Sequence, residues 1–464
     1  MPDDTPKYSL LTATSIVIAN MVGTGVFAAL FFQIDGLPSG AAILVLWLAG
    51  GVVALCGGLC YAELTGLFPR SGGEYEFLTR IYHPALGFSA GICTLVIGFA
   101  APMASVSLNL GNYFAPVLAL EQNSAGSKIV AVMSIALVTA VQMLGIRAIS
   151  WVQNISTLFK IGLVVLLIIL PFMLPGAARS DVSFALDGQA FQLIGSGNFF
   201  AALALLYYSY TGWSASIYIA SHVKNPRRNL PLSVFIGIGV VILLYVLLNF
   251  SFLYVCSFDE IRQGGDSVGN TMIAKLFGAQ TIAGWRVADI FSVMMSLALV
   301  ATLNAFMVIS PRVAEVLGND FAALGWLTHK SSNGAPYLAI GLMAAISVFL
   351  VLLSDLKSLL DYIGFSLAIF ASLPIIGIYL LRWRKPDMPR PFRVWGYPFT
   401  PFLFVVINLA MIYYSVEVMY NGDFLYGITP EGDISISPLS ASILTIIASI
   451  ALYYVVPQGK KHID

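Results

Sequence analysis

Charged residues are scarce in this chain. Asp, Glu, Lys and Arg together make up 10% of its 464 residues, whereas a soluble domain carries roughly 25%. Hydrophobic residues make up 58% of the chain, and its mean hydropathy is +0.87. This balance excludes an ordinary soluble protein, and no polar stretch is long enough to form a separate soluble domain.

Cysteine is also rare, and the four cysteines are Cys56, Cys60, Cys93 and Cys256. Three of them lie within apolar stretches, where a thiol behaves as a small hydrophobic side chain. Cys56 and Cys60 share a helix face, but no cluster of His or carboxylate residues accompanies them, so they do not predict a metal site. We expect no disulfide framework, no metal and no cofactor.

Several catalytic motifs are absent from the sequence. It contains no HExxH, no GxSxG and no Walker phosphate loop, which are the signatures of metal-dependent hydrolases, serine hydrolases and nucleotide-driven pumps. It also lacks the repeated filter sequence that a channel requires. The formal net charge of zero gives no information on partners. We therefore expect no enzyme activity and no nucleic-acid partner.

Long apolar runs, by contrast, fill the chain almost from end to end. A helix that spans a bilayer needs about 20 predominantly apolar residues. The runs of this kind cover residues 9–32, 40–68, 84–116, 129–148, 151–174, 192–219, 230–256, 285–310, 336–354, 357–381, 398–420 and 438–457. The sequence therefore predicts an all-α polytopic membrane protein of about 12 transmembrane helices, held in a lipid bilayer.

The positive charges indicate the orientation of these helices. Cytoplasmic loops carry an excess of Lys and Arg. Alternate loops, counted with the ends of the runs beside them, hold 16 and 6 of the 23 basic residues, and Lys160 alone lies deep within a run. An even number of spans and this bias together predict that both termini are cytoplasmic, in a bacterial-type inner (plasma) membrane.

Two of the runs are interrupted near their middle by glycine and small polar residues. The first interruption is IANMVGTGVFAAL at 18–30, and the second is YYSYTGWS at 207–214. Glycine in a membrane helix often serves only to let helices pack closely. However, the two runs are five spans apart and therefore cross in opposite directions, and broken helices at matching positions of two inverted halves indicate the binding site of a secondary transporter.

Broken helices suit a zwitterionic ligand. The start of the outer half of a broken helix presents free amide N–H groups with about half a positive charge, which bind a carboxylate, and the freed carbonyl oxygens bind an ammonium group. Glycine is needed because a Cβ would keep the ligand from the backbone. The predicted substrate-binding residues are Asn20, Met21, Gly23, Thr24, Gly25, Tyr207, Tyr208, Ser209, Tyr210, Thr211, Gly212 and Trp213.

Motifs along the whole chain resemble those of the amino acid–polyamine–organocation superfamily. The matching segments are NMVGTGVF at 20–27, YAELTGLFPRSGGEYEFL at 61–78, YTGWSASIYIASHVKNPRRNLP at 210–231, ATLNAF at 301–306 and SPRVAEVLGND at 310–320. The resemblance implies the leucine-transporter fold and an amino acid permease that works by alternating access. That fold has two inverted repeats of five helices, here about 9–174 and 192–381, with helices 11 and 12 at about 398–457. Ser214 and His222 stand where relatives often have acidic residues.

Lys160 is the one basic residue inside a predicted span. If that span begins near Trp151, Lys160 lies about 14 Å deep, close to the centre of a hydrocarbon core about 30 Å thick. A lysine at that depth is expensive and usually faces a cavity or a partner. In the family that the chain resembles, a lysine at this place takes the position of the second sodium ion. Lys160 is then either a proton carrier in symport or a fixed charge that braces the first helix in sodium-independent uptake or exchange.

The substrate class can be narrowed from the interrupted segments. They contain no acidic residue, which favours a neutral amino acid over a polyamine or another organic cation. A non-transporting amino acid sensor on the same fold is the main alternative function. Relatives that pair with a heavy chain use a cysteine between helices three and four. Residues 117–128 contain none, so we expect no disulfide-linked heavy chain.

Overall fold

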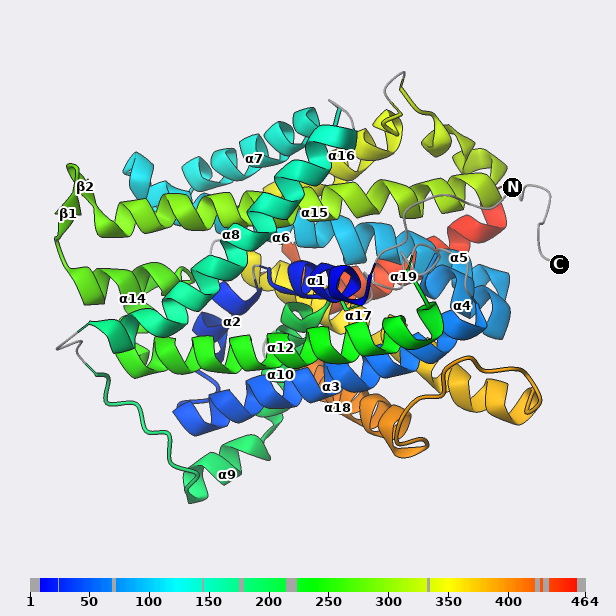
Figure 1. Cartoon of the computed structure of the whole chain (residues 1–464), viewed down its shortest axis with the longest axis horizontal. Helices are drawn as coiled ribbons and strands as arrows, with labels where there is room; N and C mark the ends of the chain where they lie inside the picture. The colour runs from blue at the N-terminus through cyan, green and yellow to red at the C-terminus, as the bar shows by residue number, and fades with distance from the viewer. Residues whose placement is uncertain are drawn as a thin grey trace.

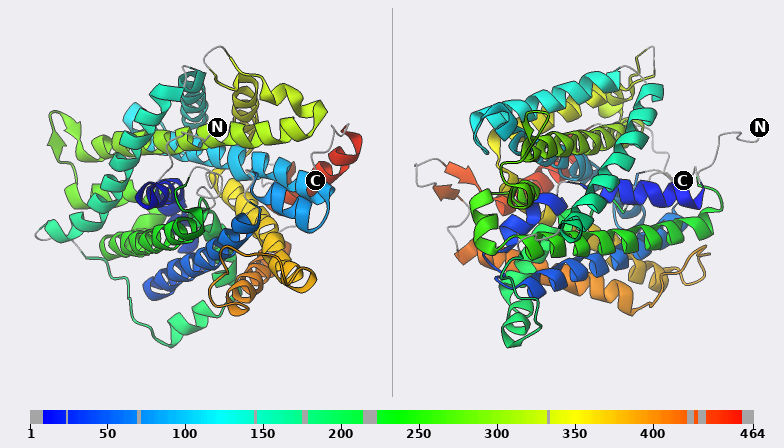
Figure 2. Two further views of the ribbon diagram at one scale, coloured as in Figure 1. Left: turned by 45° about the vertical axis from the view of Figure 1, so that its right-hand side comes forward. Right: turned by 60° about the vertical axis from the view of Figure 1, so that its left-hand side comes forward.

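A computed structural model of the chain describes residues 9–23, 25–68, 72–143, 146–174, 179–213, 223–331, 334–421, 426–428 and 434–456. Its long helices pack side by side around the N-terminal helix α1 (Leu10–Met21). The two further views show α1, in dark blue, enclosed by later helices (Figures 1 and 2).

The first half of the described chain consists of helices. They are α1, α2 (Gly25–Gln33), α3 (Gly40–Leu67), α4 (Glu74–Ile81), α5 (Pro84–Cys93), the π-helix η1 (Thr94–Ala100), α6 (Ala101–Phe114), the 3-10 helix η2 (Ala115–Leu118), α7 (Ala125–Met143), α8 (Ile146–Met173), α9 (Gly188–Ile194), α10 (Gly197–Tyr207) and the 3-10 helix η3 (Tyr208–Tyr210).

The second half adds further helices and two short antiparallel hairpins. They are α12 (Pro226–Val255), α13 (Phe258–Gly264), α14 (Val268–Phe277), β1 (Thr281–Ile282), β2 (Trp285–Arg286), α15 (Val287–Asp320), the 3-10 helix η5 (Ala322–Thr328), α16 (Tyr337–Leu353), α17 (Leu356–Arg384), α18 (Phe399–Asn421), β3 (Tyr426–Ile428), β4 (Ile434–Ile436) and α19 (Pro438–Val455).

The described helices account for the predicted membrane spans. Eight continuous helical segments are long and apolar enough to cross a bilayer, and two bent pairs, α1 with α2 and α9 with α10, raise the number to ten. Shorter apolar helices, Leu158–Met173 within α8 and α16, stand at the two remaining predicted positions. The prediction of an all-α polytopic membrane protein is confirmed.

The third span contains a stretch that the sequence did not predict. It runs unbroken over Pro84–Leu118, but its middle, η1, is a π-helix, in which the Ala101 N–H bonds to Val96 O, five residues back. The cause is local: Pro102 has no N–H to offer Gly98 O, and its ring would collide with that carbonyl in a regular α-helix. A wider turn before the proline relieves this clash, and such turns are frequent at functional sites.

The two ends of the bundle are covered by different elements. One end, here called the α14 end, carries α13, α14 and the β1–β2 hairpin, and the opposite end, the α4 end, carries α4 and the connector between α17 and α18 (Figure 1). At the first of these ends α14 stops at Phe277, and the β1–β2 hairpin follows it. At the α14 end, Arg262 of α13 donates to Asp35, just beyond α2, at 2.8 Å.

Candidate functional site

Both predicted interruptions are breaks in the described structure. α1 ends at Met21 and α2 begins at Gly25, with a bend of 41° between their axes. α10 ends at Tyr207, and one turn of 3-10 helix follows before the chain turns at Gly212, whose φ is +104°. The predicted site residue Thr24 and the family positions Ser214 and His222 lie outside the described residues.

The two breaks pack directly against each other. A Cβ on Gly212 would lie 2.7 Å from Asn20 O, and a Cβ on Gly25 would lie 2.1 Å from Ser209 Oγ and 2.8 Å from Ser209 Cα. Since real Cβ atoms do not approach backbone atoms so closely, glycine is required at both positions. Segments almost 190 residues apart in the sequence thus meet at one point in the protein.

A tyrosine from a third helix joins the two breaks. The hydroxyl of Tyr245, in α12, donates to Met21 O at 2.6 Å and to Ser209 O at 3.0 Å. Its ring also packs edge-on against Trp47, with centroids 5.4 Å apart. Tyr245 is fully buried, so its hydroxyl holds the last turn of α1 and the turn of η3 in fixed relation.

We expect Tyr245→Phe to loosen the junction of the two breaks. The change removes one shared donor and leaves two buried carbonyls short of a partner, at a cost of about 1–3 kcal/mol. Thermal unfolding of the purified variant should show the loss, and initial uptake rates should fall by about tenfold. As a control, Tyr413→Phe changes an exposed tyrosine on α18 and should alter neither quantity. Equal behaviour of the two variants would contradict this role for Tyr245.

Lys160 lies beside the first break. It is 1% exposed, and its ammonium group donates to Ala19 O at 2.9 Å and to Thr302 Oγ1, from α15, at 3.2 Å. Ala19 belongs to the last turn of α1, where unpaired carbonyls carry about half a negative charge. The helix end and a hydroxyl therefore stabilise the ammonium group without a carboxylate partner in the described part of the chain.

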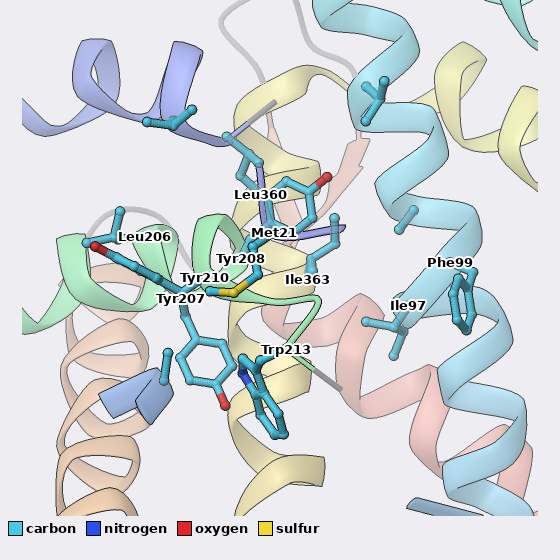
Figure 3. Close-up of a cluster of buried hydrophobic side chains, with 14 of the residues drawn as sticks. Met21, Ile97, Phe99, Leu206, Tyr207, Tyr208, Tyr210, Trp213, Leu360 and Ile363 are labelled. Carbon is cyan, nitrogen blue, oxygen red and sulfur yellow. The ribbon is translucent and has the colours of Figure 1, made fainter. Parts of the chain in front are cut away.

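A cavity adjoins the junction of the breaks. The cavity is partly open to solvent. Its lining residues come from both breaks and from five further elements, α4, α5, η1, α15 and α17: Asn20, Glu74, Cys93, Thr94, Ile97, Gly98, Phe99, Tyr207, Thr211, Gly212, Trp213, Phe306, Ile309, Leu367, Phe370 and Ala371. Figure 3 shows Trp213 across from Ile97 and Phe99 of η1.

Five of the predicted site residues line this cavity, namely Asn20, Tyr207, Thr211, Gly212 and Trp213. The hydroxyl of Tyr207 is buried and has no hydrogen-bond partner among the described residues, so it is available to a ligand. Trp213 also packs edge-on against Tyr61, with centroids 4.6 Å apart.

The other described residues of the predicted set support the junction instead. Met21 O and Ser209 O already accept from Tyr245, and Tyr208 O accepts from the Thr211 N–H at 3.0 Å. Tyr210 points away from the cavity and donates to Trp47 O at 2.7 Å. Gly23 faces Thr302 of α15. A carbonyl oxygen has two lone pairs, so these bonds do not exclude a ligand.

Sequence reasoning missed the rest of the lining. The predicted set contained only residues of the two interrupted runs. Thr94, Gly98, Phe306 and Phe370 occur in ordinary apolar stretches, and their exposure to the cavity follows from helix packing. The one local signal is Pro102, because a proline at this position favours a wider turn before it, and that turn, η1, lines the cavity.

The first break presents partial charges of both signs within a few residues, although the residues of α2 are not among those that line the cavity. The N-terminus of α2 presents free amides and the positive end of its dipole, and the last turn of α1, with Asn20 O, presents acceptors. Apolar and aromatic side chains form most of the remaining wall. The site is suited to a small zwitterion with an apolar substituent.

Comparisons with known proteins agree with this description. The amino acid permease family matches residues 8–447. The chain is 27% identical to the human b(0,+)-type amino acid transporter 1, over 90% of this chain and 84% of that protein. It is 27% identical to the human large neutral amino acids transporter small subunit 2, over 84% and 72%. It is also 27% identical to the serine/threonine exchanger SteT of Bacillus subtilis (strain 168), over 86% and 88%.

Proposed function

Because this chain belongs to the amino acid permease family, it is an amino acid transporter and not an enzyme, and we propose that it carries neutral amino acids across the membrane by alternating access at the junction of its two broken helices. The observation that carries this proposal is the direct packing of the breaks, Gly212 on Asn20 and Gly25 on Ser209, beside a cavity that residues of both breaks line.

The substrate is held at both charged ends. Its carboxylate binds the amides that begin α2, where the helix dipole favours an anion. Its ammonium group binds carbonyl oxygens of the α1 break, where Asn20 lines the cavity. Its side chain extends among Ile97, Phe99 and Phe306, which supports an apolar amino acid over a polyamine.

Lys160 acts as a fixed charge in this proposal. Its ammonium group already bonds to a carbonyl and a hydroxyl oxygen beside the α1 break, and such oxygens are the ligands that a hard cation takes. A second cation would be repelled from the same oxygens, so transport is independent of sodium. The bracing role is favoured over proton transfer because both contacts of Lys160 secure the helix that binds substrate.

The cavity opens toward the cytoplasm. It extends to Glu74 of α4, and the α4 end carries the loops rich in Lys and Arg. At the α14 end, Arg262 and Asp35 join α13 to the chain just beyond α2, which closes that side. Both termini are cytoplasmic, the chain lies in a bacterial-type inner membrane, and residues 9–174 and 192–381 form the inverted repeats.

Uptake into proteoliposomes tests this proposal. Purified protein should accumulate radiolabelled neutral amino acids when the vesicles are preloaded with unlabelled amino acid, and equally in sodium and in potassium buffer. A sensor would instead be stabilised by amino acids in a thermal-shift measurement, through binding to the folded state, and show no flux. Binding without flux would therefore overturn the transport proposal in favour of the sensor, and sodium-dependent uptake would overturn the role of Lys160.

A further inference from the structure

The connector between α17 and α18 is rich in positive charge. From Arg382 to Arg393 it contains five basic residues, Arg382, Arg384, Lys385, Arg390 and Arg393, and one acidic residue, Asp387. The connector lies at the α4 end, away from the cavity lining.

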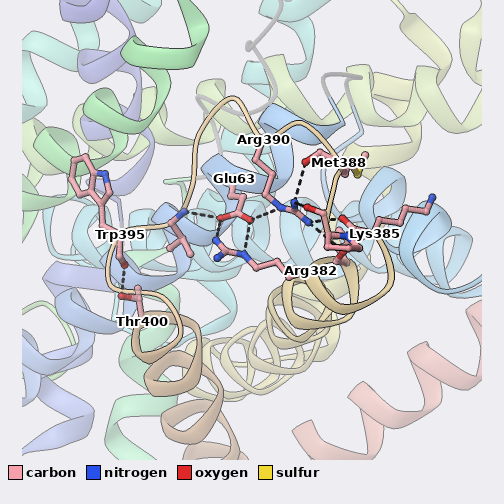
Figure 4. A network of polar contacts seen from close by, with 10 residues as sticks. Glu63, Arg382, Lys385, Met388, Arg390, Trp395 and Thr400 are labelled. Atoms are coloured by element: carbon pink, nitrogen blue, oxygen red, sulfur yellow. Dashed lines mark hydrogen bonds and ion pairs between the residues drawn. The ribbon is translucent and has the colours of Figure 1, made fainter.

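Two of these five basic residues, Arg382 and Arg390, are held inside by a buried carboxylate. Glu63 of α3 is fully buried, and its carboxylate accepts from Arg382 at 2.7 Å and 3.2 Å and from the Val394 N–H at 2.6 Å. Arg390 lies 3.6 Å from the same carboxylate and also donates to Leu381 O and Lys385 O near the end of α17. Figure 4 shows the connector folded around Glu63.

This network brings both ends of the connector to one place. Arg382 comes shortly before Arg384 and Lys385, and Val394 directly follows Arg393. Since Arg382 and Val394 bind the same carboxylate, the three remaining cations are gathered around one point. Glu63 therefore pairs with Arg382 and Arg390.

Arg384, Lys385 and Arg393 are exposed, and the structure gives their side chains no ion pair or hydrogen bond within the described part of the chain. Figure 4 shows the Lys385 side chain pointing away from the Glu63 network. Asp387 is the one acidic residue between them, so the exposed face of the connector keeps a net positive charge. This charge is not needed to hold the connector, which Arg382 and Arg390 already secure.

Large aromatic side chains flank these cations. Trp383 is 78% exposed, Trp395 47% and Phe399 76%. Tryptophan in membrane proteins concentrates at the level of the lipid headgroups, and basic residues at that level attract anionic lipid. Trp383 and Trp395 therefore set the three cations at the depth of the phosphate groups.

We propose that Arg384, Lys385 and Arg393, flanked by Trp383 and Trp395, form a binding site for the phosphate of an anionic phospholipid. The lipid adds negative charge where the connector has an excess of positive charge, and its acyl chains lie against the exposed aromatic rings. The site is separate from the substrate cavity, so its occupation does not depend on transport.

The test is a titration of the full-length protein in a neutral detergent with dioctanoyl phosphatidylglycerol, followed by thermal unfolding. We expect this lipid to raise the midpoint by several degrees. The triple variant Arg384→Gln, Lys385→Gln, Arg393→Gln should need at least tenfold more lipid for the same rise. Arg393→Gln alone should show a smaller shift of the titration in the same direction.

A matched control replaces three other exposed cations of the same membrane side. Lys224→Gln, Arg228→Gln, Arg312→Gln removes the same charge from residues without a described ion pair, and it should respond to phosphatidylglycerol as the wild type does. Equal loss of response in both triple variants, or no loss in the connector variant, would overturn the site. An equal rise of the midpoint with inorganic phosphate would show that the site binds a free anion and not a lipid. An equal rise with dioctanoyl phosphatidylcholine would show that the lipid need not be anionic, and would also overturn the proposal.

Discussion

Gly212→Ala is expected to reduce uptake to below about 1% of wild type. Gly212 has φ +104°, a conformation that residues with a Cβ rarely adopt, and holding it costs a non-glycine residue about 1–3 kcal/mol. The new Cβ would also lie 2.7 Å from Asn20 O and 2.8 Å from Asn20 C. The backbone must then move apart at the point where the two broken helices meet, and initial uptake rates in proteoliposomes measure the loss.

A glycine elsewhere in the bundle provides the control. A Cβ on Gly239 of α12 would meet no atom within 4 Å, and alanine in a helix is favoured over glycine by about 0.5–1 kcal/mol. Gly239→Ala should therefore transport as the wild type does and unfold at an equal or higher temperature. If Gly212→Ala transported as well as Gly239→Ala, the junction of the breaks would not be part of the transport site.

Lys160→Ala is expected to lower uptake by about 10- to 100-fold. The change removes hydrogen bonds from a charged donor to Ala19 O and Thr302 Oγ1, and each such bond contributes about 1.5–3 kcal/mol. The last turn of α1 loses its fixed cation, so the helix end that binds substrate is no longer held. Rates of exchange between internal and external amino acid provide the measurement.

Lys330→Ala serves as the matched lysine control. Lys330 is half exposed and pairs with Glu315 at 3.0 Å, and an exposed pair of this kind contributes at most about 1 kcal/mol. Exchange by Lys330→Ala should stay close to the wild-type rate. Wild-type exchange by Lys160→Ala, with protein folded as judged by thermal unfolding, would remove Lys160 from the mechanism.

The class of the fold and the position of the breaks follow from local sequence. Apolar runs of spanning length indicate membrane helices directly, and the glycines at 25 and 212 stand where the backbone comes close to other backbone. Each of these signals is contained in a short segment, so a single sequence suffices to find it. Lys160 is found for the same reason, because one charge in an apolar run is conspicuous.

The contacts that complete the site depend on pairs far apart in the chain. Tyr245 is one aromatic residue in an apolar run, and nothing nearby indicates that its hydroxyl reaches Met21, 224 residues away. Glu63 lies 319 residues from Arg382, so its partner could not be predicted from its neighbours. Tyr210 stands within the second break yet turns toward Trp47, because a short 3-10 turn sends successive side chains in different directions.

The most direct test of the account uses analogues that lack one charge. Uptake of the radiolabelled amino acid that stabilises the protein most should be measured with a 100-fold excess of the same amino acid, of its amide, or of its deaminated acid. If peptide dipoles at the two breaks bind both ends of the substrate, the intact amino acid abolishes uptake and neither analogue inhibits it measurably. Inhibition by the amide or by the deaminated acid as strong as that by the amino acid would contradict the account.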